Sequence, residues 1–350
     1  MKGDNTMKKW LKVFFPTAAL LIMAISAQAA EHPRVIRFAY PAATNPDYAG
    51  SPLVNVINNQ NLFEKEFAKD GIKIEQSFIK TAGPGTNEGL AAGLFDFADY
   101  GDFAIVLGKA GGLKNRLILS PSKGGNVYIL ARASLHINSV KDLRGKKVSY
   151  WKGTVLQTQA LRVLEANGLT EKDIRQINLN GADALAALAA GTIDAVVGSY
   201  DRPLVDQGLA TLVYDTRNFP VSKRYREGLV VSEDFAQKYP DITKRVAKVF
   251  IQAAYWASQE KNKEQLIQLL VKTGAKYKYA KGEIGVGNLS QKDQFDPRPD
   301  HENTNDYKGL IDFSLKNKLI RTNIDVDKWV DKSYADAALK ELGLQNYWAK

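Results

Sequence analysis

The 350-residue sequence contains no cysteine, which excludes disulfides, thiolate metal sites, a thiol nucleophile and a lipid-carrying cysteine after a leader peptide. Its three histidines, His32, His136 and His301, lack the spacing of metal ligands. The sequence also has no nucleophile elbow, no P-loop lysine motif and no dinucleotide-binding fingerprint that follows a strand. We therefore expect no metal, no cofactor and no enzyme activity.

Hydrophobic runs long enough to cross a membrane are missing as well. A basic pair, Lys8-Lys9, precedes an apolar run over residues 13–27. This run of about 15 residues is shorter than the roughly 20 that span a bilayer. Ala27-Gln28-Ala29 offers small residues for cleavage. We predict a cleaved signal peptide over residues 1–29, with Met1 or Met7 as the start, and a soluble protein exported to the periplasm.

The charged residues are dispersed along the chain, although the formal net charge is +10. No long basic run and no ladder of basic and aromatic residues is present, so we expect no nucleic-acid partner. A mild positive field favours anionic small molecules. The charge pattern therefore agrees with a protein that binds a small anion, and we expect the protein to be a monomer.

One phrase occurs twice in the sequence. Residues 90–102 read Leu-Ala-Ala-Gly-Leu-Phe-Asp-Phe-Ala-Asp-Tyr-Gly-Asp, and residues 188–201 read Leu-Ala-Ala-Gly-Thr-Ile-Asp-Ala-Val-Val-Gly-Ser-Tyr-Asp. Each copy predicts the end of a helix, a glycine stop and a short buried strand that finishes near a carboxylate. Asp96 and Asp194 directly follow apolar residues at the strand starts, and we interpret them as structural turn residues. The repetition predicts two similar lobes.

Strand and helix signals alternate along the rest of the chain, which indicates an α/β fold with mostly parallel sheets and helices on both faces. Besides the strand of each repeat copy, the predicted strands are residues 35–40, 72–78, 117–120, 126–132, 147–150, 174–179, 212–214 and 227–232. The predicted helices are residues 52–59, 61–69, 86–93, 103–110, 140–145, 154–168, 182–190, 240–259, 263–272, 307–317 and 327–342. We expect residues 82–86 to form a loop before a helix capped by Thr86 or Asn87, and residues 281–306 to be irregular.

Two of the predicted strands, residues 126–132 and 227–232, pass from one alternating unit to the other. Two crossings divide the chain into lobe I, residues 30–126 with 230–350, and lobe II, residues 127–229. Lobes joined in this way can close over a ligand by a hinge motion.

Candidate ligand-binding residues follow from the rule that ligands of open α/β sheets lie beyond the carboxyl ends of the strands. Five such ends supply the candidates Tyr40, Gly83, Gly85, Gly101, Asp102, Lys152, Gly153, Thr154, Tyr200 and Asp201. Gly153 lets backbone approach a ligand, and a helix that begins at Thr154 offers free N–H groups to an anion. The simpler interpretations are that Thr154 and the two carboxylates cap helices and that Lys152 is solvated.

Arg298 and three aromatic residues complete the candidates. Arg298 lies between two prolines, where a rigid backbone could present the guanidinium to an oxyanion, although a plain surface arginine is the alternative. Tyr40, Trp151 and Tyr200 could contact an apolar tail of the ligand, or could equally belong to the core.

The order of elements resembles the periplasmic substrate-binding proteins of the nitrate/sulfonate/taurine import family, most of all the aliphatic-sulfonate binders. The matching motifs are Ala82-Gly83-Pro84, the two Ala-Gly phrases with Asp96 and Asp194, Gly101-Asp102, residues 140–148, Lys152-Gly153-Thr154 and Arg298-Pro299. Two places depart from the family. Sulfonate binders often carry Trp-Asp-Pro-aromatic where this chain has Tyr200-Asp201-Arg202-Pro203, and the first strand ends in Ala39-Tyr40-Pro41 and not in Gly-Tyr.

The resemblance implies a two-lobed type II periplasmic-binding fold with two crossover strands, and delivery of the ligand to the permease of an ABC transporter in the inner membrane. It implies ligand contacts near Gly83, Gly101, Asp102, Gly153, Thr154 and Arg298. The implied ligand is an aliphatic sulfonate or taurine, and the alternative is a heteroaromatic vitamin precursor of the pyrimidine type. A desulfinase-like enzyme of the same fold would need a cysteine nucleophile, which this chain lacks.

Overall fold

The computed structural model describes residues 32–43, 45–198, 202–285 and 287–349. The predicted signal peptide and the candidates Tyr200 and Asp201 lie outside the described residues. Within the part that is described, no helix has the length and apolarity needed to cross a membrane.

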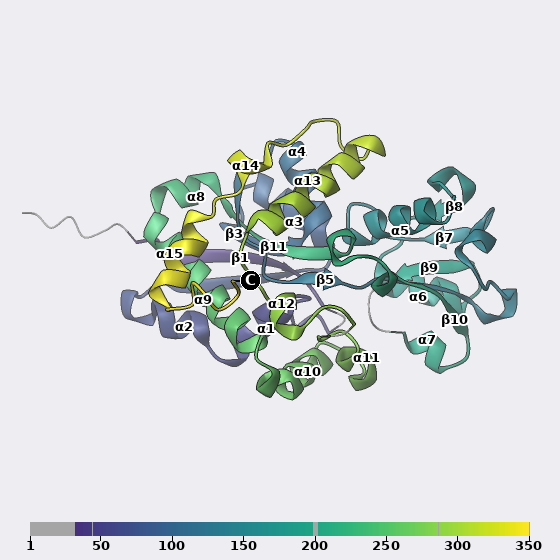
Figure 1. Cartoon of the computed structure of the whole chain (residues 1–350), viewed down its shortest axis with the longest axis horizontal. Helices are drawn as coiled ribbons and strands as arrows, with labels where there is room; N and C mark the ends of the chain where they lie inside the picture. Colours follow the sequence, from purple (N-terminus) through teal and green to yellow (C-terminus); the bar gives the residue numbers. More distant parts are fainter. Residues whose placement is uncertain (1–31, 44, 199–201, 286, 350) are drawn as a thin grey trace, which may run out of the picture. The chain divides into compact units, whose positions relative to one another are not determined.

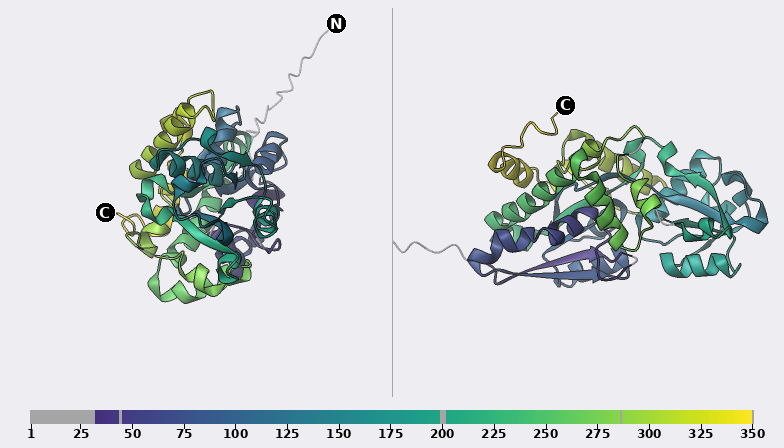
Figure 2. Two further views of the ribbon diagram at one scale, coloured as in Figure 1. Left: turned by 90° about the vertical axis from the view of Figure 1, so that its right-hand side faces the viewer. Right: turned by 90° about the horizontal axis from the view of Figure 1, so that it is seen from below.

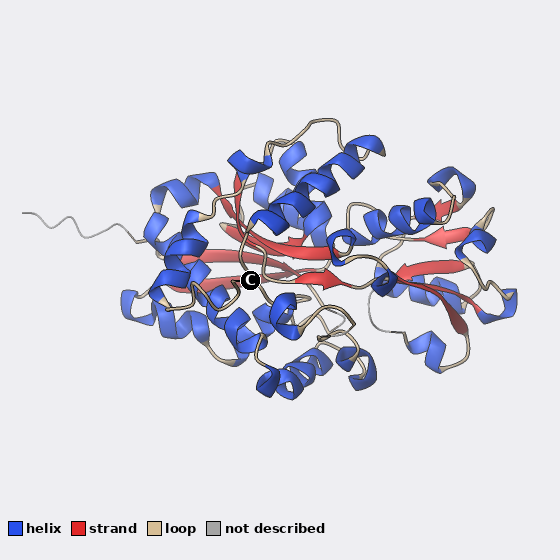
Figure 3. Cartoon of the chain, viewed as in Figure 1, coloured by secondary structure: helices blue, strands red, loops and turns tan. Residues whose placement is uncertain are grey.

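The strands form two sheets, drawn in red in Figure 3. The first sheet has the order β2-β1-β3-β11-β4, with β5 paired to β11, and the second has the order β10-β6-β9-β7-β8. Strand β1 is parallel to β2 and β3, and β7 is parallel to β8 and β9, whereas β11 and β6 run antiparallel to their neighbours. The bounds are β1 Val35–Pro41, β2 Lys73–Ile79, β3 Phe97–Gly101, β4 Asn115–Leu119, β5 Lys123–Gly125, β6 Tyr128–Arg132, β7 Lys147–Ser149, β8 Arg175–Ile177, β9 Ala195–Gly198, β10 Ala210–Asp215 and β11 Tyr225–Ser232.

Helices connect and cover the strands. The α-helices are α1 Pro52–Asn59, α2 Leu62–Phe67, α3 Ala82–Ala91, α4 Asp102–Ala110, α5 Val155–Ala166, α6 Gly181–Ala189, α7 Pro203–Asp206, α8 Glu233–Lys238, α9 Pro240–Ala257, α10 Lys263–Lys272, α11 Tyr277–Lys281, α12 Gln291–Gln294, α13 His301–Lys316, α14 Val326–Trp329 and α15 Ser333–Glu341. Short 3-10 segments are η1 Ala68–Asp70, η2 Ala133–Leu135, η3 Val140–Leu143, η4 Glu171–Asp173, η5 Thr216–Asn218, η6 Val221–Lys223 and η7 Glu260–Asn262.

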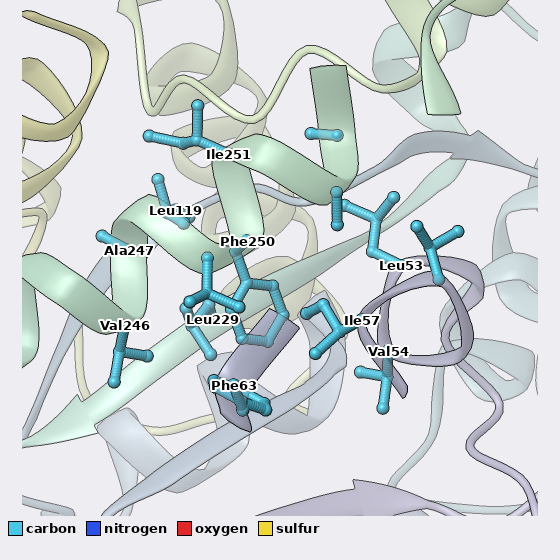
Figure 4. Packing of buried hydrophobic residues seen from close by; sticks show 14 of the residues in the cluster. Leu53, Val54, Ile57, Phe63, Leu119, Leu229, Val246, Ala247, Phe250 and Ile251 are labelled. Carbon is cyan, nitrogen blue, oxygen red and sulfur yellow. The ribbon is translucent and has the colours of Figure 1, made fainter. Parts of the chain in front are cut away.

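Successive residues of the first sheet bury opposite faces, as a pleated strand requires. Phe38 of β1 packs in a cluster with α1, α2 and α9, whereas the next residue, Ala39, packs in a second cluster with α4, α13 and α14. Figure 4 shows Phe250 of α9 beside Ile57 of α1 and Phe63 of α2. The sheet is therefore covered by helices on both faces.

The second sheet is built in the same way. Ile129 and Ala131 of β6 share a cluster with α5, and Tyr128 and Leu130 share another with α6 and Leu204 of α7. In Figure 1, α5 lies on one side of this sheet and α6 and α7 lie on the other. Each sheet thus has its own hydrophobic layers, which is what a two-lobed α/β protein needs.

The chain passes between the sheets twice. It leaves the first sheet after β5 to enter β6, and it returns from β10 through η5 and η6 to β11. The colours of Figures 1 and 2 follow this path, with the teal elements in the second sheet and the purple and yellow ones around the first. The predicted pair of crossover strands is confirmed, while the exact borders of lobes I and II stay a prediction.

Four short elements, β5, α7, α8 and α11, were not predicted, and three further segments differ from their prediction. Residues 82–86 are not a loop, because α3 begins at Ala82. Pro84 is tolerated there, since the N–H groups of the first turn have no partner within the helix. The Thr86 hydroxyl does not cap this helix and donates instead to the carbonyl oxygen of Ala82 at 2.9 Å.

The other two differences lie near the C-terminus. Residues 281–306 contain α12 and the start of α13, where the Asp300 carboxylate accepts a hydrogen bond from the N–H of Asn303 at 2.9 Å. The helix predicted over residues 327–342 is interrupted, because Val330 pairs with Leu117 of β4 between α14 and α15.

Candidate functional site

The two copies of the repeated phrase share their local structure. In each, a glycine with positive φ follows a helix, at 67° for Gly93 and 75° for Gly191. The Asp96 carboxylate accepts a hydrogen bond from the N–H of Arg37 on β1 at 2.8 Å, and Asp194 accepts one from the N–H of Lys147 on β7 at 2.9 Å. Both carboxylates hold the neighbouring parallel strand, so their interpretation as structural turn residues is confirmed.

Asp102, the first residue of α4, is 5% exposed. Its Oδ1 accepts from the N–H of Phe103 at 2.7 Å, and its Oδ2 accepts from the N–H of Arg226 on β11 at 3.1 Å. Burial raises the pKa of Asp102 to about 6, against the opposing effect of the Arg226 and Arg162 guanidinium groups. The carboxylate joins the start of α4 to a crossover strand, and its contact with a ligand stays a prediction.

Three of the predicted glycines come together at the starts of α3, α4 and α5. A Cβ atom at Gly83 would lie 3.2 Å from the carbonyl oxygen of Gly153, and one at Gly101 would lie 2.4 Å from Cγ1 of Val155. Gly153 has a φ of 77°, which a side chain would strain. Because no larger residue fits at this approach, the first turns of three helices and the positive ends of their dipoles are concentrated in one place.

The segment from Lys152 to Thr154 is held by partners within the protein. The Thr154 hydroxyl oxygen accepts from the N–H of Leu156 at 3.3 Å, and the N–H of Gly153 donates to Oε1 of Gln157 at 2.8 Å. Nζ of Lys152 lies 3.6 Å from Oε1 of Glu171. The capping role of Thr154 is confirmed, and ligand contacts of this segment stay a prediction.

Arg298 is engaged with a carboxylate two residues away. Its Nε and Nη2 donate to the two oxygens of Asp296 at 2.9 and 2.7 Å, and Nη2 also donates to the carbonyl oxygen of Trp348 at 2.6 Å. The hydrogen bonds with Asp296 raise the pKa of Arg298. The Asp296 carboxylate thus already occupies the hydrogen-bond donors with which this guanidinium could bind a ligand anion.

Tyr40 and Gly85 are both packed against other parts of the protein. The Tyr40 ring is buried in the core, with ring centroids 5.8 Å from Phe38 and 6.2 Å from Phe78. A Cβ at Gly85 would meet the Thr81 hydroxyl oxygen at 1.9 Å, so this glycine serves the close packing of the first turn of α3. Direct ligand contact by either residue stays a prediction.

A buried acidic pair was missed from the sequence. Asp99 of β3 is fully buried, and Glu227 on β11 is partly buried. Burial raises the pKa of Glu227 to about 7, and burial together with the charge of Glu227 raises the pKa of Asp99 well above its usual value. The available signal was an aspartate in the middle of a strand that otherwise reads as apolar and small residues.

A second missed group connects α7, at the end of the second repeat copy, to α11. The Arg202 guanidinium carbon lies 3.8 Å from the ring centroid of Tyr128 and 4.3 Å from that of Tyr279. The Tyr279 hydroxyl donates to Asp206 at 2.5 Å, and Lys276 Nζ lies 3.0 Å from the same carboxylate. Hydrogen bonds from Lys278, Tyr279 and Lys276 lower the pKa of Asp206. The whole group links the two sheets through their covering helices.

A cavity of about 490 Å³ lies between α5, η6 and α13, beside Asp102. Arg162 lines it, with its guanidinium carbon 5.1 Å from the ring centroid of Phe313 and its Nη1 donating to the carbonyl oxygen of Lys223 at 2.5 Å. Burial lowers the pKa of Arg162. No group of three or more His, Asp or Glu residues in the described ranges could hold a metal ion.

Comparisons with known proteins agree with this architecture. The family model described as NMT1/THI5 like matches residues 67–264. The chain is 27% identical over 296 residues to a protein of Bacillus subtilis (strain 168) named as an aliphatic sulfonates-binding protein, covering 83% of this chain and 86% of the relative.

Solved structures give the same result for the fold. A periplasmic sulfonate-binding protein SsuA from Methylobacillus flagellatus KT superposes with a TM-score of 0.75 at 28% identity, covering 89% of this chain and 96% of that chain. The desulfurization enzyme DSZB has a TM-score of 0.63 at 15% identity, over 89% of this chain and 100% of that chain, which shows a shared fold alone. The predicted two-lobed periplasmic-binding fold is confirmed.

Proposed function

This chain belongs to the NMT1/THI5-like family, and from that premise we propose that it is the solute-binding component of an ABC importer. It captures a small organic anion, with sulfonates as the favoured class, between its two lobes. The supporting observation is the meeting of the starts of α3, α4 and α5 at Gly83, Gly101 and Gly153. Backbone N–H groups and helix dipoles that meet at one point form a site for an anionic headgroup.

The relatives support the choice of sulfonate. The Bacillus subtilis protein is named for aliphatic sulfonates, and the Methylobacillus flagellatus protein for sulfonate. The anion contacts in this proposal are backbone N–H groups near Gly83, Gly101, Gly153 and Thr154, and the N–H of Gly153 contributes only if the ligand replaces the side-chain oxygen of Gln157. Arg298 contributes only if a ligand displaces Asp296, which costs its two hydrogen bonds.

Binding without catalysis is the second part of the proposal. The chain has no cysteine, whereas a desulfinase-like reaction needs a cysteine nucleophile. The N-terminal basic pair, apolar run and Ala27-Gln28-Ala29 support export to the periplasm through a cleaved signal peptide. There the protein delivers its ligand, as a monomer, to a permease in the inner membrane.

Thermal unfolding of the mature protein with a series of solutes tests this proposal. The series contains alkanesulfonates, taurine, nitrate, bicarbonate and an aminopyrimidine. Because a ligand that binds only the folded state adds stability, a sulfonate at about 100 times its Kd contributes about 2.7 kcal/mol and raises Tm. No shift with any sulfonate, together with a shift by the aminopyrimidine, would replace the proposal with the vitamin-precursor alternative.

A further inference from the structure

The two repeat copies differ at one buried position. Aligned from Leu90 and Leu188, the copies place Asp99 opposite Val197. Val197 is part of the core packed against α5, as the pattern of a buried strand requires. Asp99 is equally buried, at 0% exposure, yet carries a carboxyl group. Because a carboxyl in such a position costs stability, its presence in one copy only calls for a function.

The sheet register places Tyr40, Asp99 and Glu227 on one face. Strand β3 pairs Asp99 with Leu229 and Gly101 with Glu227 of β11, so the two carboxyl groups are diagonal neighbours. Strand β1 pairs Ala39 with Ala98, which brings Tyr40 beside Asp99. All three residues therefore converge at the ends of β1 and β3, where α1 and α4 begin.

Few hydrogen-bond donors from the surrounding protein reach this group. Both donors that reach it, the hydroxyls of Ser51 and Ser122, donate to Oε2 of Glu227 at 3.1 and 3.0 Å. Each hydroxyl has a single hydrogen, so Ser51, which also lies close to Asp99, can serve only one of the two carboxyl groups at a time. Within the described part of the chain, both oxygens of Asp99 and the Tyr40 hydroxyl have no hydrogen-bond partner.

The nearby cationic side chains are directed to other carboxylates. Lys123, 3% exposed, lies 3.8 Å from Oε2 of Glu302. The Arg226 guanidinium pairs with Asp306, and Arg298 pairs with Asp296. No ion pair with Asp99 or Glu227 is found among the described residues. The acidic pair is thus short of both donors and positive charge.

We propose that Asp99, Glu227 and Tyr40 form the part of the ligand site that binds an ammonium or similar N–H donor group of the solute. This inference rests on the proposed function and specifies its ligand as an organic zwitterion, such as an aminoalkanesulfonate. The anionic group lies at the starts of α3, α4 and α5, and the ammonium group at the acidic pair. Arg226 links the two places, because its N–H donates to Asp102 and it directly precedes Glu227.

Binding of an ammonium group must change the protonation of the pair. Burial raises the pKa of both carboxyl groups, so that protons remain on the pair near neutral pH in the free protein. A bound cation favours the ionised forms, and a proton therefore leaves to the buffer on binding. A ligand without the ammonium group has no such effect.

Calorimetric titration with taurine and propane-1-sulfonate tests the inference, since the two differ only by an ammonium in place of a methyl group. We expect taurine to bind at least about tenfold more tightly, as a charged hydrogen bond predicts. We also expect proton release with taurine alone, measured in two buffers of different ionisation enthalpy. Equal affinities without proton release would overturn the inference and leave the proposed function intact.

Variants separate the acidic pair from general effects. Asp99→Asn should remove the preference for taurine and its proton release, and Asp327→Asn, an exposed carboxylate paired with Lys308, should change neither. If Asp99→Asn fails to fold, Glu227→Gln takes its place, and preserved preference in the folded variant overturns the inference. If no sulfonate binds, the proposed function fails. The inference is then tested with 4-aminobutyrate and pentanoate: tighter binding of 4-aminobutyrate with proton release supports it, and equal affinities without proton release overturn it.

Discussion

The two copies of the Leu-Ala-Ala-Gly phrase have the same contacts at the start of their strands and different residues toward the end of them. Asp96 and Asp194 make the same hydrogen bond to the N–H of the neighbouring parallel strand. Three residues later, one copy has Asp99 and the other has Val197. The first copy ends at Asp102, and Gly101 just before it pairs with Glu227 of β11. The second copy is followed by Arg202, whose guanidinium lies close to two tyrosine rings.

The copies therefore contain aspartates of two kinds: Asp96 and Asp194 hold the fold together, whereas Asp99 has no structural contact of this type in the part of the chain that is described. A carboxylate at the strand start has backbone and guanidinium donors, so its burial is compensated. The Asp99 carboxyl has none of these among the described residues. The two copies can therefore be compared with each other. We interpret a residue that both copies have as one needed for folding, and a buried polar residue that only one copy has as one with a function.

Exchange of the residues at the position where the copies differ, Asp99 and Val197, should cause the largest change in stability. Val197→Asp places a carboxyl without donors in a valine-filled core, and we expect it to destabilise the protein by about 4 kcal/mol or more. Asp99→Val restores the residue of the other copy and should stabilise the protein by about 1–2 kcal/mol at pH 7. Urea unfolding measures both. Destabilisation by Asp99→Val would mean that the acidic pair is needed for folding.

Removal of the aspartate that both copies have should cause the next largest loss of stability. Asp96 is 6% exposed and accepts from the N–H of Arg37 as well as from its half-exposed guanidinium. Asp96→Ala leaves the N–H without this partner, whereas water can reach the guanidinium, and the variant should lose about 2–3 kcal/mol of stability. Asp194 is more exposed, and Asp194→Ala should cost about 1–2 kcal/mol. Urea unfolding of both variants measures the ratio. Equal losses would show that the two turns are equivalent despite their different burial.

Much of the fold could be predicted because its signals are local. Glycine stops and alternating apolar residues placed most strands and helices within two residues, and α10 coincides with its prediction. The start of α3 was misread because Gly-Pro-Gly resembles a loop, although proline is tolerated in a first helical turn. The start of α13 was misread because its cap, Asp300, lies within a polar segment that looks irregular.

The site was harder to predict because it depends on contacts between distant segments. Gly83, Gly101 and Gly153 were proposed separately, and only the structure shows that they approach one another. The sequence presented Arg298 as a free cation, although Asp296 stands two residues before it. Asp99 was read as part of a strand, since the depth of β3 beneath α1 and the distance from Glu227 along the chain are tertiary properties.

The pH dependence of stability sharpens the comparison further. The pKa of Glu227 is raised from 4.5 to about 7, mainly by burial, so the folded state binds more protons than the unfolded state between these values. Stability from this group is therefore fully present below about pH 4.5 and is lost as the pH rises toward 7. Between pH 5 and 7 the loss should be about 2 kcal/mol.

Glu227→Gln has no such proton and should show a flatter dependence of stability on pH over this range, by about the same 2 kcal/mol. Val197 on the other copy has no titratable group, so Val197→Ala should lower stability by a similar amount at every pH. Urea unfolding at pH 5, 6 and 7 compares the three proteins. A slope that Glu227→Gln leaves unchanged would assign the pH dependence to the other buried carboxyl groups, Asp99 and Asp102, whose pKa values burial also raises.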